Sequence, residues 1–154
     1  MNPITAVREA LLARLREINQ SAGYFTNAGG AVSVGWFEEV IAAADKPSTP
    51  FIVLQPHASE ESPSAAADTL RVPLAFRVIG AVQTPVADYQ SALDELTCDL
   101  VRCLFPMQGY RPQWAAADMG KFSVGGPRQF PPGDGLNYST VAILLTTSAL
   151  LHEV

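Results

Sequence analysis

Apolar residues recur at steps of three and four through residues 3–19 and again through residues 85–104, and this period predicts two amphipathic helices. Asn2 is a suitable N-cap for the first helix and Pro3 fits its first position, while Thr84 and Pro85 play the same parts in the second. Charged residues lie off both apolar stripes. We expect them to be solvated, including three carboxylates of the second helix, Asp88, Glu95 and Asp99.

Strands follow from a different pattern. The segment from Leu70 to Val82 alternates, which predicts a long strand with one buried face, and Pro73 within it indicates an edge or a bulge. Phe51–Gln55 and Tyr138–Leu151 are apolar on both faces, so we expect the first inside the sheet and the second at its centre or at an interface. The remaining expected elements are strands at Tyr24–Thr26 and Ala31–Phe37, joined as a hairpin by Asn27–Gly30, a helical turn at Glu38–Ala44, and a strand at Lys121–Val124.

Two segments read as long loops. Pro56–Ala67 is polar, acidic and interrupted by proline, and Gly125–Leu136 is rich in glycine and proline. Together the elements predict a single α+β domain over residues 1–154, with a mostly antiparallel sheet and two main helices packed on one face. The expected core contains Leu11, Leu15, Phe76, Val78, Leu93, Leu96, Leu100 and Ile143.

The charge balance argues against one class of partner. The 154 residues carry a formal net charge of −5, and the two lysines, Lys46 and Lys121, are far apart. Binding of nucleic acid through its phosphates needs clustered Lys and Arg, so the chain is a poor candidate for that function. The longest apolar run is too short to span a bilayer, and we expect no membrane contact.

The sequence offers little reactive chemistry. Cys98 and Cys103 are five residues apart in a helical pattern, which suits neither a disulfide within the helix nor a C-x-x-C motif, so we expect two free thiols. His57 and His152 are isolated and belong to no metal-ligand spacing. The string Gly120–Gly125 has the wrong spacing for a nucleophile elbow or a phosphate-binding loop. We predict that the chain is not an enzyme and has no catalytic, cofactor-binding or metal-binding residues.

Two strings carry a resemblance to a known family. Ile4–Leu12 leads into Gly23–Gly29, and the order of helix, strands, helix and hairpin that follows resembles the tail terminator proteins of long-tailed bacteriophages. The resemblance implies a structural virion protein of the phage tail and neck, assembled in the host cytoplasm. It implies a closed homo-oligomer, a hexameric ring, that caps the tail tube, ends its polymerisation and presents a docking surface to the head–tail connector protein. The tail-tube protein would lie on the other side, and DNA would pass through the channel without specific binding.

Other functions remain open from the residues alone. The chain could be another phage neck or tail completion protein, or a small-molecule-binding α+β domain or enzyme whose site is not visible in sequence. We expect the two long loops to become ordered where subunits or partners meet. The residues that we select as interface candidates are Gly126, Pro127, Arg128, Phe130, Asp134, Arg71 and Arg77.

Overall fold

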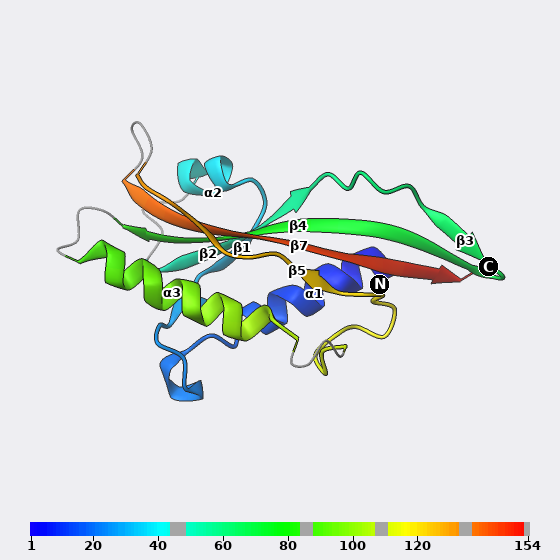
Figure 1. Cartoon of the computed structure of the whole chain (residues 1–154), viewed down its shortest axis with the longest axis horizontal. Coiled ribbons are helices and arrows are strands. Elements are labelled where there is room, and N and C mark those ends of the chain that lie inside the picture. The colour runs from blue at the N-terminus through cyan, green and yellow to red at the C-terminus, as the bar shows by residue number, and fades with distance from the viewer. Residues whose placement is uncertain (44–48, 84–87, 107–110, 133–136, 153–154) are drawn as a thin grey trace.

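The computed structural model describes residues 1–43, 49–83, 88–106, 111–132 and 137–152, and it shows helices packed against one seven-stranded sheet (Figure 1). The strand order is β1-β2-β4-β7-β5, with β3 beside β4 and β6 beside β7. The strands are β1 Val32–Val34, β2 Phe51–His57, β3 Ser64–Ala66, β4 Thr69–Gln83, β5 Ser123–Val124, β6 Arg128–Phe130 and β7 Tyr138–His152. The helices are α1 Pro3–Leu15, α2 Phe37–Ala43 and α3 Tyr89–Leu104, with short 3-10 turns at Gln20–Ala22 and Ala28–Gly30.

This architecture confirms the α+β prediction. β1 runs parallel to β2, and the other strand pairs of the described residues are antiparallel. β4 and β7 pair over their whole length, from Thr69 opposite His152 to Gln83 opposite Tyr138. They form the long central ribbon of the sheet, which places the final strand inside the sheet as its apolar middle predicts.

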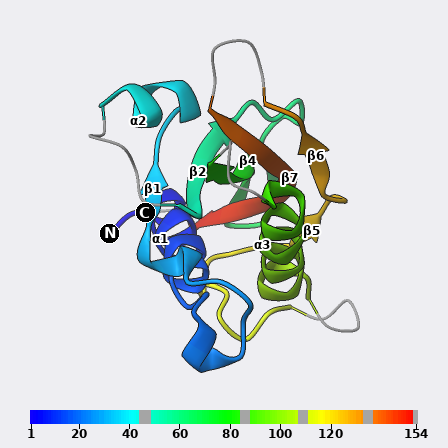
Figure 2. The same ribbon diagram turned by 90° about the vertical axis from the view of Figure 1, so that its left-hand side faces the viewer.

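Both long helices cover the same face of this sheet, as the two apolar stripes predict (Figure 2). All eight residues of the expected core are buried at 5% exposure or less. Gly80 on β4 lets α3 come close, because a Cβ there would lie 2.8 Å from a methyl carbon of Leu96 and 3.0 Å from one of Leu100. The smaller α2 lies on the opposite face, where it packs with Phe51, Val53 and Ile79.

The helix starts follow their capping chemistry. Asn2 Oδ1 accepts a hydrogen bond from the Thr5 amide at 2.8 Å, as expected for the N-cap of α1. α1 ends at Leu15 rather than near residue 19, and the chain turns there through N–H bonds from Glu17 and Ile18 to the carbonyls of Arg14 and Leu15. α3 begins at Tyr89 with Asp88 as its N-cap. The cap expected from Thr84 and Pro85 lies outside the described residues.

The expected hairpin over residues 24–37 is wrong. Tyr24–Thr26 is not a strand, and Val32–Val34 pairs in parallel with β2 instead of folding back on residues 24–26. The main-chain N–H groups of Phe25 and Thr26 donate to the carboxylate of Asp99 on α3, at 2.9 and 2.8 Å, so they are not free to form a ladder. The expected helical turn at Glu38–Ala44 is present as α2.

Both segments expected to be long loops contain strands. Pro56 and His57 complete β2, and Ser64–Ala66 is β3, paired with the start of β4. In the second segment, Arg128–Phe130 is β6, paired with Thr140–Ala142 of β7. Pro73 falls between the stretches of β4 that pair with β3 and with β2, so it occupies a local edge as expected.

Candidate interaction surface

The second face of the sheet is only partly covered. Phe37 of α2 stacks on Phe51 with ring centroids 6.1 Å apart, and Tyr138 meets Phe51 edge-on at 5.3 Å, which closes the β2 side of this face. Toward β6 no helix covers it among the described residues (Figure 2). This open area is where an external partner can contact the sheet.

The structure brings three of the expected interface residues together on this open area. Arg77 of β4 lies opposite Leu144 of β7, and the pairing of β6 with β7 puts Arg128 and Phe130 on the same face as Leu144. Leu144 and Phe130 are each 43% exposed. We call these four residues, Arg77, Arg128, Phe130 and Leu144, the sheet-face patch.

The patch combines positive charge with apolar surface. The Arg128 guanidinium carbon lies 6.0 Å from the centroid of the Phe130 ring, close enough for a cation–π contact. Among the described residues, neither Arg77 nor Arg128 has a carboxylate oxygen within 4 Å. Glu38 of α2 lines the same shallow depression as Arg77 without pairing with it. Chemically, the patch suits an acidic surface with some aliphatic character.

Arg71 is placed apart from the patch. It lies opposite Leu150, six residues before Arg77 on β4, and forms an ion pair with Glu61 at 3.4 Å. Both partners are exposed, so the pair contributes little to stability. Between Arg71 and the patch runs an open groove of about 600 Å³, with Lys121 and His57 among its lining residues. His57, expected in a flexible loop, is the last residue of β2.

The remaining interface candidates lie in the connection between β5 and β6 or outside the described residues. Gly126 and Pro127 are exposed in that connection, where Gly125 N–H donates to the Leu144 carbonyl at 2.8 Å. Asp134 lies outside the described residues. The predicted interface residues that the structure describes therefore lie in three separate places. Leu144 is not among them, because its place in an apolar run gives no sign of exposure.

The α3 carboxylates differ from one another. Glu95 is exposed, as expected, but the expectation of a solvated Asp99 is wrong because it is fully buried. Asp94 accepts hydrogen bonds from Gln129 of β6 and from Gln90. These two bonds, of which that from Gln129 has the larger effect, hold the pKa of Asp94 below its usual range. No local pattern indicates that Asp99 is buried, because its partners, the N–H groups of Phe25 and Thr26 and the Thr26 hydroxyl, are distant in sequence.

The thiols and histidines are separate from this surface. Cys98 is exposed and Cys103 is buried, and both are free. Burial raises the pKa of the Cys103 thiol to about 11, against the opposing effect of Arg14, so this thiol is protonated at neutral pH. On the surface, His152 Nε2 lies 3.8 Å from Asp118 Oδ1. Within the described ranges, no three His, Cys, Asp or Glu side chains are grouped to hold a metal ion.

Two further observations concern the chain as a whole. The helices of the described segments are all too short or too polar to cross a bilayer. No model of a known protein family and no curated protein matches this sequence.

Proposed function

We propose that the chain is a structural virion protein that caps a phage tail tube as a ring, ends tube polymerisation and provides the docking surface for the head connector. The observation that carries the proposal is the long β4–β7 ribbon, whose end projects past α1 and α3 together with β3 (Figure 1). The strings Ile4–Leu12 and Gly23–Gly29, which resemble tail terminators, lend further support.

The projecting end is suited to contact between subunits. The first six residues of β4 are all at least partly exposed, whereas most of its later residues are buried. We call this end of the ribbon, Thr69–Leu74 with the β7 residues opposite them, the arm. Leu70 is 42% exposed and pairs with Leu151, which is half-buried, so apolar side chains lie at the tip of the arm. At about 3.3 Å per residue, strands of this length reach roughly 50 Å. The outermost pairs of the arm, Thr69–Arg71 with Leu150–His152, contribute no residue to the buried core.

A ring requires contacts of this type. Rings form through heterologous interfaces, in which two different surfaces of each subunit meet and the rotation closes. The arm supplies one extended surface, and the two faces of the sheet, one of them only partly covered, supply others. In the proposed assembly, six copies surround a channel through which DNA passes without specific binding. One side of the ring contacts the tail-tube protein and the other contacts the connector, in the virion after assembly in the host cytoplasm. No catalytic step belongs to this function.

Purified protein tests the proposal. Its mass in solution, measured by light scattering and native mass spectrometry, is expected to correspond to a closed oligomer alone or on tubes assembled from the tail-tube protein of the same phage. Negative-stain electron microscopy is expected to show end-on rings and capped tube ends. A protein that stays monomeric in the presence of tubes and never halts their growth contradicts the proposal.

A further inference from the structure

The exposed surface of α3 carries the opposite charge to the sheet-face patch. Asp94 and Glu95 are both exposed in the first half of α3, and Asp88 caps the same end. In the described residues none of the three lies within 4 Å of a basic side chain. We call Asp94 and Glu95 the acidic α3 surface.

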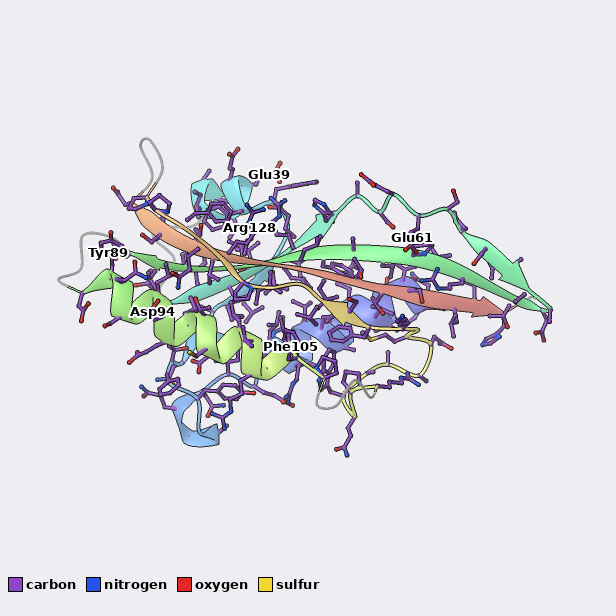
Figure 3. All side chains as sticks on the ribbon, viewed as in Figure 1. Glu39, Glu61, Tyr89, Asp94, Phe105 and Arg128 are labelled. Atoms are coloured by element: carbon purple, nitrogen blue, oxygen red, sulfur yellow. The ribbon has the colours of Figure 1, made fainter. Side chains whose placement is uncertain are left out.

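These two surfaces lie on opposite faces of the sheet. Figure 3 shows Arg128 on the same side of the sheet as α2, and Asp94 on the side of α3. One copy cannot bring its own patch onto its own α3, because the sheet separates them. Two copies can pair a patch with an α3 surface, and each pairing leaves one patch and one α3 surface free for further copies. That is the geometry of a heterologous, ring-forming contact.

From this complementarity we propose that the sheet-face patch of one copy binds the acidic α3 surface of the next copy. The inference rests on the proposed function, because it assigns an interface within the proposed ring. Docking of a helix on the open face would give the sheet a helical layer on both faces. It would also cover Phe130 and Leu144, whose exposed apolar area is the nonpolar part of the contact.

The neighbouring charges set where the helix can lie. Glu38 and Glu39 project from the first turn of α2, beside the patch, and Glu61 neutralises Arg71 at the far end of the groove. An acidic helix is repelled from these carboxylates, so the attractive position is limited to the side of the face near β6. This repulsion between like charges fixes the register of the contact and opposes other positions of the helix.

Charge reversal tests the contact directly. The variant Arg77→Glu with Arg128→Glu places two carboxylates in the patch, and Asp94→Lys with Glu95→Lys reverses the α3 surface. We expect each double variant alone to self-associate at least ten-fold more weakly than the unmodified chain in light scattering at low salt. Arg8→Glu on α1 with Arg16→Glu at its C-cap makes the same change in net charge as Arg77→Glu with Arg128→Glu, away from the patch, and is expected to leave association unchanged. Circular dichroism melts of all variants verify folding.

Mixing the two reversed variants gives the decisive result. In an alternating assembly every interface is either two original surfaces or two reversed ones, so an equimolar mixture is expected to recover the oligomer that neither variant forms alone. Failure of the mixture to assemble, or normal assembly of either variant alone, overturns the inference. Variants that form rings but no longer cap tubes would assign the patch to the tube protein instead, and would leave the proposed function standing. An unmodified chain that neither associates nor caps tubes contradicts the proposed function itself.

Discussion

Replacing the buried carboxylate of Asp99 with an amide is expected to loosen the segment that follows α1. The carboxylate accepts the Phe25 amide at 2.9 Å on one oxygen, and the amide and hydroxyl of Thr26, each at 2.8 Å, on the other. Asp99→Asn keeps the shape but replaces one acceptor oxygen with an NH₂ group. That group faces N–H donors, so at least one buried main-chain N–H loses its partner.

The size of the effect follows from these three bonds. Hydrogen bonds to a charged group contribute about 1.5–3 kcal/mol, and an unsatisfied buried donor costs about 1–3 kcal/mol. The Thr26 hydroxyl can turn to accept from the new amide, which recovers part of the loss. We therefore expect a decrease of about 2–4 kcal/mol in the free energy of unfolding, equivalent to a fall in melting temperature of roughly 10 °C.

Urea denaturation followed by circular dichroism measures this change. Glu95→Gln makes the same chemical substitution one turn earlier on α3, at an exposed site, and should stay within about 0.5 kcal/mol of the original chain. If Asp99→Asn also falls within that range, the carboxylate does not anchor residues 25 and 26. Thr26→Val, which removes the hydroxyl but keeps the N–H, should cost less than Asp99→Asn.

The remaining predictions concern the core and the buried thiol. Leu96→Ala is expected to cost about 2–5 kcal/mol because Leu96 is fully buried, and an unchanged denaturation midpoint would remove it from the core. Gly80→Ala is expected to cost about 1–3 kcal/mol by pressing its methyl group against Leu96 and Leu100, which a urea midpoint equal to that of the original chain would contradict. The pKa of Cys103 is raised from 9.0 to about 11, so the folded state holds a proton that the unfolded state releases, and its contribution to stability is complete below pH 9. That contribution, about 2–3 kcal/mol, is lost as the pH rises from 9 to 11, and Cys103→Ser, having no thiol to ionise, should show a smaller loss in urea melts over this range.

Elements determined by local periodicity could be predicted from the sequence. The stripes of α1 and α3, the alternation of β4 and the apolar run of β7 each depend on residues close in the chain, and all four elements are present. The hairpin at residues 24–37 could not be judged in this way. The N–H groups of Phe25 and Thr26 are bound by the carboxylate of Asp99, 74 and 73 residues away in sequence, and no local pattern predicts such a partner.

The candidate surface shows the same limit in another form. Arg77 belongs to a predicted strand face and Arg128 to a glycine-rich segment, and only the register of β4, β7 and β6 places them on one face. Leu144 is exposed because it points to a part of the face over which no helix lies in the described structure, whereas its sequence neighbours Ile143 and Leu145 point to the helix-covered face and are buried. Exposure of a residue within an apolar strand depends on which elements cover it, and this information is absent from the strand itself.

The direction of the main-chain groups at β6 bears on how copies can meet. Gly125 N–H donates to the carbonyl of Leu144, so even-numbered residues of β7 turn their N–H and C=O groups toward this edge. Arg128 and Phe130 lie opposite even-numbered β7 residues and therefore bond inward, to β7. The residues between and beside them turn their main-chain groups outward.

Those outward positions are Pro127, Gln129 and Pro131, and two of the three have no N–H to donate. Proline at an edge is a common protection against pairing with a foreign strand. At the opposite edge, β1 has three residues, too few for a strong ladder. With the β6 edge blocked and β1, β3 and β5 too short for a strong ladder, strand addition is a poor route for joining copies of this chain. The face of the sheet, with Arg77, Arg128 and two exposed apolar side chains, is the better surface, and for this reason the charge-reversed variants test the face rather than the edges.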